Sequence, residues 1–93
     1  MLNDEMYKEV AEYWGDRMPM MAMEEMAELI KAISKFERLD FAEETNEMIK
    51  SAWLNVIDEI GDVFISCKAL MSRYGIPQER VDKRINDKLN KKY

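Results

Sequence analysis

Hydrophobic residues recur every three to four positions along most of the chain, which is the spacing of one face of an α-helix. Gly15 and Gly75 suit helix ends, and Pro19 and Pro77 suit the first turns of the helices that follow. The chain contains only three glycines and two prolines, which disfavours a hairpin-rich sheet. The pattern predicts an all-α fold with helices over four stretches: about 3–14, 19–39, 51–74 and from 77 onward.

The segment between the second and the long third stretch is less regular. Asp40 is followed three positions later by Glu43, an arrangement that resembles a helix cap, so a further helical segment is expected to begin at Asp40. Residues 1–93 are expected to form one domain, a bundle of four to five helices. A chain of this length buries only about 60–65% of its unfolded surface, so pairing with a second copy would add needed burial.

Acidic residues border the apolar faces of two of the predicted helices. At about 100° per residue, three acids fall at the edge of the apolar face of their helix: Glu25, Glu28 and Glu59. Asp62 falls just beyond that edge. Glu24 turns further toward solvent, whereas Trp53 falls inside the apolar arc and is expected in the core. If the two helices pack together, four carboxylates meet in one crevice: Glu25, Glu28, Glu59 and Asp62.

These acids lack local compensation. Glu25, Glu59 and Asp62 have no basic residue three or four positions later, and like charges at that spacing repel by about 0.2–0.5 kcal/mol per pair. A hard divalent cation would explain the arrangement. Because the chain has no histidine and only one cysteine, magnesium or manganese is favoured over zinc. The alternative is a solvated acidic helix edge, since 19 of 93 residues are acidic and such spacings arise by chance.

Charge and composition restrict the partners. The formal net charge of −5 argues against direct binding of a nucleic-acid backbone. No apolar run approaches the roughly 20 residues that span a bilayer, and the acidic start is unlike a secretory signal, so no membrane association is expected. The single Cys67 suits a reducing cytoplasm. Methionines near the start of the second stretch fit either a core or an adaptable association surface.

The segments EEMAELIKAI (24–33) and DEIGDVFIS (58–66) resemble the MazG-like family of nucleoside triphosphate pyrophosphohydrolases. The family has an all-α fold and the signature Glu-Glu-x-x-Glu, a variable connection, then Glu-x-x-Asp. The tail INDKLNKKY is similar to the family's closing helix. The connection between Glu28 and Glu59 is 30 residues, which is slightly long for the family. The resemblance covers about residues 14–93.

The resemblance implies a role for each matching residue. Glu24 would orient water or accept its proton, and Asn86 and Lys88 would contact phosphates. Leu89 and Lys92 replace an aromatic residue and an arginine of the family pattern, and lysine lacks the bidentate grip of arginine. Four acids would bind Mg²⁺, with Mn²⁺ as a substitute: Glu25, Glu28, Glu59 and Asp62.

The implied function is hydrolysis of (deoxy)nucleoside triphosphates to a nucleoside monophosphate and pyrophosphate, by attack of a metal-activated water at the α-phosphorus. The implied assembly is a homodimer or a dimer of dimers, and the expected location is the cytoplasm. Trp14 is the better of the two tryptophans for stacking on a nucleobase. The alternative is a module without turnover, either a nucleotide-binding domain or a helical interaction domain with the same fold.

Overall fold

The computed structural model describes residues 4–92, and all regular structure in that range is helical. The expected all-α fold is confirmed. Within the same range, no helix is long and apolar enough to cross a membrane. The elements in order are α1 (Asp4–Trp14), a short 3₁₀ turn η1 (Gly15–Arg17), α2 (Met18–Glu37), α3 (Asn46–Tyr74) and α4 (Gln78–Lys92).

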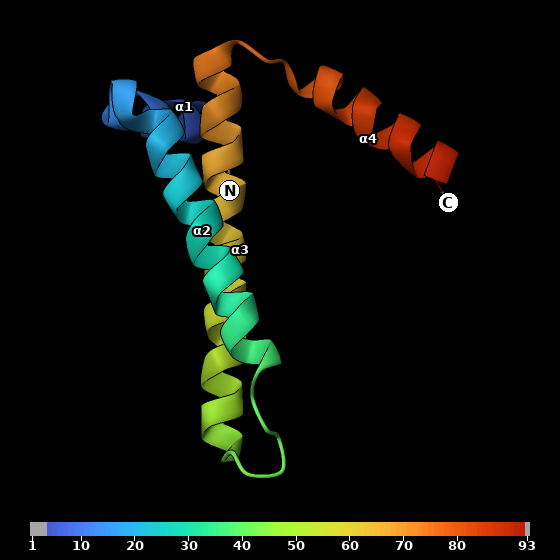
Figure 1. Cartoon of the computed structure of the whole chain (residues 1–93). Coiled ribbons are helices and arrows are strands. Elements are labelled where there is room, and N and C mark those ends of the chain that lie inside the picture. Colours follow the sequence, from blue (N-terminus) through green and yellow to red (C-terminus); the bar gives the residue numbers. More distant parts are fainter. Residues whose placement is uncertain (1–3, 93) are drawn as a thin grey trace.

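An antiparallel pair of helices, α2 and α3, forms the body of the molecule (Figure 1). The connection between them is a turn, so the helical segment expected to begin at Asp40 is absent. The Asp40 side chain instead accepts a hydrogen bond from the backbone N–H of Ala42 at 3.0 Å, which favours a turn over a helix. α3 begins directly after Thr45, whose hydroxyl caps the helix by accepting the N–H of Met48 at 3.1 Å.

Small side chains let α2 and α3 approach closely. Ala22 and Ala32 of α2 and Ala52 and Ala69 of α3 are all buried, with relative exposures between 0 and 9%. Alanine leaves little bulk between two helix backbones, so residues beside the alanines on each helix are brought within reach of the other helix. This close contact places the acidic segments of the two helices opposite each other.

α1 crosses the C-terminal half of α3 and closes one end of the pair. A small core forms there from Ala11, Met18, Ala22 and Ala69, with Trp14 packed against it. Polar contacts hold the same end together. The guanidinium of Arg73 donates to the Gly15 carbonyl at 2.9 Å and to Asp16 at 3.3 Å, and the Lys68 ammonium lies 3.4 Å from Asp4 and 5.4 Å from the centre of the Tyr7 ring.

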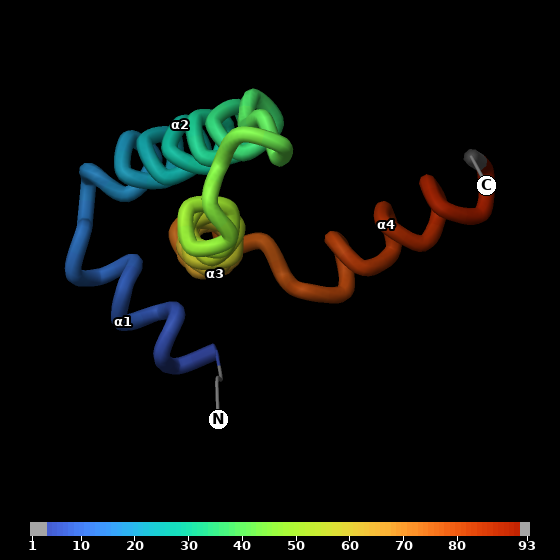
Figure 2. The backbone as a smooth tube through the Cα atoms, turned by 90° about the horizontal axis from the view of Figure 1, so that it is seen from below, coloured from blue at the N-terminus to red at the C-terminus, as the bar shows by residue number. Residues whose placement is uncertain are grey.

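α4 extends away from the rest of the chain (Figures 1 and 2). α3 ends at Gly75, whose φ of +65° is left-handed, and the chain then turns out of the pair. Seen end-on in Figure 2, α1 lies on one side of the α2–α3 pair and α4 departs on the other. The radius of gyration is 16.4 Å, against about 12 Å for a compact chain of this length.

Many large apolar side chains of this chain are exposed to solvent. Trp53, expected in the core, is 51% exposed, and Phe64 is 68% exposed. The apolar arcs of α2 and α3 are wider than the strip that each helix covers on the other, so part of each arc stays in solvent. The reason is that the small buried core is built largely from alanine.

Replacing the α3 cap tests its role in this fold. Thr45→Ala removes the hydroxyl that satisfies the Met48 N–H, so we expect the free energy of unfolding to fall by about 1 kcal/mol. Chemical denaturation measures the change. Thr45→Ser keeps the hydroxyl and serves as the matched control; an equal loss in both variants would show that the hydroxyl contributes nothing.

Candidate metal centre

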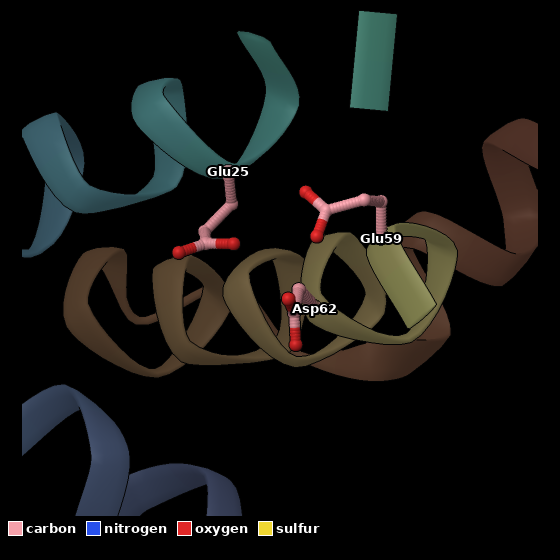
Figure 3. Close-up of side chains that lie close together, drawn as sticks. All are labelled: Glu25, Glu59 and Asp62. Carbon is pink, nitrogen blue, oxygen red and sulfur yellow. The ribbon is translucent and has the colours of Figure 1, made fainter. Parts of the chain in front are cut away.

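Three of the predicted acids meet between α2 and α3 (Figure 3). Glu25 reaches across from α2, and Glu59 and Asp62 come from neighbouring turns of α3. One carboxylate oxygen of each residue lies within 4.8 Å of the corresponding oxygens of the other two. We call these three residues the acidic cluster. They belong to two segments that are far apart in the sequence, with 33 residues between Glu25 and Glu59, so only the helix pairing brings them together.

The cluster is partly shielded from water. All three residues are half-buried, Glu25 on α2 and Glu59 and Asp62 on the side of α3 that faces it. The Oε2 atom of Glu59 is screened from solvent and has no hydrogen-bond partner within residues 4–92. An unsatisfied buried carboxylate oxygen is costly, and native proteins rarely leave one without a proton, a donor or a cation. The cluster is therefore short of positive charge.

The crowding of acids without a nearby cation also raises the pKa of two residues. The pKa of Glu25 is raised above its ordinary 4.5 by partial burial, then by the negative charges of Asp62, Glu59 and Glu28, and by a hydrogen bond to Asp62. Burial also raises the pKa of Glu59, followed by the charges of Asp62, Glu28 and Asp58. Each effect disfavours the ionised form, and a bound cation would reverse all of the repulsive ones.

No basic side chain neutralises the cluster in the part of the chain that the structure describes. The ion pairs there join Lys68 to Asp4, Arg73 to Asp16 and Lys83 to Asp87. All three lie outside the cluster. The donor set is oxygen only, which suits Mg²⁺ or Mn²⁺ and disfavours zinc. The residues thus fit the predicted kind of ion.

The other two glutamates of α2 stand apart from the cluster. Glu28 is exposed and lies outside the group of three, although it is close enough for its charge to raise the pKa of both Glu25 and Glu59. Its role as a ligand stays a prediction. Glu24 is exposed one position before Glu25 and so points about 100° away around the helix, on the solvent side.

The residues predicted to contact phosphate are not brought to the cluster by this chain. Asn86 and Lys88 lie on α4, which extends away from α2 and α3. Both are exposed. They can reach phosphates held at the cluster only if α4 moves or if a second copy supplies it.

A groove beside the cluster was missed by the sequence analysis. Val10, Trp14 and Ile65 line a pocket of about 220 Å³ together with Glu25 and Asp62. The first three residues also line a larger, mostly apolar groove of about 600 Å³ that continues along α1, whose other walls include Tyr7 and Tyr13. The apolar spacing of Tyr7, Val10 and Trp14 in α1 was the available signal, but the sequence does not reveal where α1 crosses α3.

Comparison of the chain with protein-family models, with curated proteins and with solved structures gives no match. The likeness to the MazG-like signature therefore rests on the motif residues themselves. The structure adds one independent fact, that residues from both halves of the signature share a cluster.

The raised pKa values of Glu25 and Glu59 predict how pH affects stability without divalent cations. The folded protein keeps protons on Glu25 and Glu59 that the unfolded chain releases near pH 4.5, so their contribution to stability is fully present below that pH. It is lost as the pH rises through their raised folded-state pKa values. Denaturation in chelator from pH 4.5 to 8 should show this decline, and Glu59→Gln should reduce it.

Added magnesium should offset the loss at neutral pH. An ion present at 100 times its dissociation constant raises the free energy of unfolding by about 2.7 kcal/mol. Thermal unfolding with and without Mg²⁺ measures the effect, which should shrink in Glu59→Gln and persist in Glu43→Gln, an exposed glutamate of the α2–α3 turn. Equal magnesium stabilisation of both variants would exclude the cluster as the binding site.

Proposed function

We propose that this protein is a Mg²⁺-dependent nucleoside triphosphate pyrophosphohydrolase of the MazG-like kind. One observation supports the proposal above the others. Glu25, from the first half of the signature, shares a half-buried, cation-deficient cluster with Glu59 and Asp62 from the second half. A chance set of solvated acids has no reason to converge in this way, because convergence of like charges costs free energy.

The reaction is hydrolysis between the α and β phosphates. Water attacks the α-phosphorus, the bond from that phosphorus to the bridging oxygen breaks, and pyrophosphate leaves with the bridging oxygen. The water donates its hydroxyl to the nucleoside monophosphate and loses a proton to a base. In this proposal Glu24 is the base, since the chain contains no histidine, and because it lies on the solvent side of α2 it would accept the proton through an intervening water.

The residues of the cluster prepare the site for an anionic substrate. Glu25, Glu59 and Asp62 supply oxygen ligands from two rigid helices, and Glu28 adds a fourth carboxylate at the exposed edge. Mg²⁺, or Mn²⁺ in its place, would supply positive charge to the phosphates and would make a nearby water more acidic when bound there. Without that charge the acids would repel a triphosphate, so substrate binding and metal binding are coupled.

The apolar groove fits the other end of such a substrate. Trp14 contacts both the cluster pocket and the groove along α1, so a nucleotide with its phosphates at the acids can direct its base toward the Trp14 ring. Aromatic stacking is worth about 1–3 kcal/mol per base and suits any base. We assign Trp14 as the stacking residue.

Assembly into a homodimer, or a dimer of dimers, completes the proposal. The single chain is extended and leaves α4 apart from α2 and α3. In this proposal, a bundle of four or more helices forms when helices of two copies pack together, because one chain alone does not form it. Asn86 and Lys88 would contact phosphates at the site of another copy.

A second candidate function is a helical interaction module without turnover, in which the acids are merely solvated. The extent of exposed apolar surface on α2 and α3 favours some association partner whether or not the protein is an enzyme. A nucleotide-binding module that lacks turnover has the same fold and site. Calorimetric titration with Mg²⁺ and a non-hydrolysable triphosphate distinguishes these two, since only the latter binds nucleotide.

Incubation with mixed dNTPs and Mg²⁺ tests the enzyme directly. We expect release of pyrophosphate, and we expect Glu59→Gln to lower the rate by about 100-fold or more, because loss of a supporting group at a metal site already costs 10–100-fold. Glu43→Gln is the control for loss of a carboxylate elsewhere. Circular dichroism checks that both variants stay helical; turnover of no canonical or modified nucleotide would contradict the proposal.

Replacing Trp14 tests its assignment as the residue that stacks on the nucleobase. Trp14→Leu keeps an apolar side chain in the small core but removes the ring, so KM should rise by about 5-fold or more while kcat changes little, as expected for about 1 kcal/mol of lost stacking. Steady-state kinetics measures both constants. Phe41→Leu, an exposed aromatic in the α2–α3 turn, is the control; an unchanged KM in Trp14→Leu would refute the assignment.

A further inference from the structure

Ser66, in the second half of α3, is the one buried polar residue in the part of the chain that the structure describes, with 0% of its surface exposed. A serine inside a helix ordinarily turns its hydroxyl to solvent or to the backbone carbonyl four residues earlier. The Ser66 Oγ does neither, because it is screened from solvent and has no hydrogen-bond partner within residues 4–92. Its hydroxyl is therefore available for a further interaction.

The need for a small side chain does not explain this hydroxyl. Ala52, Glu59 and Ser66 follow one another at intervals of seven residues, which brings them to nearly the same side of α3. Ala52 and Ala69 are buried there with relative exposures of 9% and 0%. Alanine at position 66 would let the helices approach as closely, without the free-energy cost of a buried hydroxyl that lacks a partner. The serine requires another explanation.

The place of Ser66 on α3 brings it next to the acidic cluster. At about 100° per residue, Ser66 lies about 40° around the helix from Asp62 and about 20° from Glu59, in the angle between the two. It comes one turn after Asp62, about 6 Å further along the helix axis. Because side chains of an α-helix lean toward its N-terminus, Ser66 leans toward the turn that carries Asp62. The hydroxyl is thus aimed toward the cluster.

The unsatisfied atoms of α3 complement each other in a cation site. Within the described residues, the buried side-chain atoms without a hydrogen-bond partner are Glu59 Oε2 and Ser66 Oγ, and Asp62 lies between them along the helix. The first is an acceptor that lacks positive charge, and the second is a donor that lacks an acceptor. A carboxylate that binds a cation keeps lone pairs for a hydrogen-bond donor, and carboxylates in metal sites are ordinarily held by such donors.

No charged group takes this part at Asp62. The ion pairs of residues 4–92 are made by Lys68, Arg73 and Lys83, and their acidic partners lie outside the cluster. A buried hydroxyl one turn away can therefore donate to Asp62 without competition from a basic side chain.

We propose that Ser66 is a positioning residue of the metal centre, whose Oγ–H donates a hydrogen bond to the Asp62 carboxylate when a divalent cation is bound and so fixes the orientation of that carboxylate. A hydroxyl that donates to an ionised carboxylate makes a short, charge-assisted bond and favours the ionised form that binds cations. The same bond satisfies the buried hydroxyl. This inference rests on the cation site of the proposed function, but not on turnover or on the identity of the substrate.

Replacing Ser66 should change ion binding and metal-free stability in opposite directions. Ser66→Ala removes the donor, so the dissociation constant for Mg²⁺ should rise by about 10-fold, as expected for loss of a group that supports a metal ligand. In chelator the urea midpoint of Ser66→Ala should be higher than that of the wild type, because the variant no longer buries an unpaired hydroxyl. Titration calorimetry with Mg²⁺ alone measures the first effect, and chemical denaturation measures the second.

An exposed serine on the same helix provides the matched control. Ser72→Ala makes the same chemical change six residues later, about 240° around α3 from Ser66. It should leave both the affinity for Mg²⁺ and the metal-free midpoint unchanged. Mn²⁺, followed through the electron paramagnetic resonance of the free ion, should rank the three proteins in the same order.

Three results would overturn the proposal. One is an equal affinity for Mg²⁺ in the wild type and in Ser66→Ala, and another is a lower midpoint of Ser66→Ala in chelator, which would show that the hydroxyl is already satisfied without a cation. The third is a wild type that binds neither ion, which would remove the metal centre as well. A wild type that binds Mg²⁺ about 10-fold more tightly than Ser66→Ala but releases no pyrophosphate would refute the proposed activity and support this inference.

Discussion

The close antiparallel contact between α2 and α3 is the constraint on which the rest of the structure depends. Buried alanines on both helices keep the backbones near each other. At that separation Glu25 reaches Glu59 and Asp62, although the two segments are far apart in the sequence. Larger residues at the alanine positions would bury more apolar surface but would push the helices apart. The contact therefore gives up core volume and brings the acids together.

The close α2–α3 contact through alanines explains two features of the structure. An alanine-rich core is small, so a single chain leaves large apolar side chains such as Phe64 in solvent. At the same contact, an oxygen of Glu59 has no hydrogen-bond partner among residues 4–92. One feature calls for an apolar partner and the other for positive charge. Because different side chains are concerned, both needs can be met at once.

Much of this organisation was predictable from the sequence, because helical periodicity is a local property. The spacing predicted the helices and placed Glu25 and Glu59 at the edges of apolar faces, and in the structure these two residues lie close together with Asp62. Non-local geometry was not predictable. The sequence does not show that α1 crosses α3 beside the acids, nor that α4 leaves the body and takes Lys88 with it. Trp53 was misjudged because an apolar arc does not reveal which part of it a partner covers.

α3 carries residues of the helix contact, acids of the cluster and exposed apolar residues on different parts of its surface, so it is sensitive to insertions within the helix. One residue inserted between Trp53 and Glu59 would rotate every later residue of α3 by about 100° and turn the Glu59 carboxylate away from Glu25. The turn over 38–45 has no such restriction, because each helix keeps its own phase whatever the length of the chain between them. Insertions and deletions are thus tolerated in that turn and excluded from the helices, which leaves the turn as the place where extra residues accumulate without harm to the cluster.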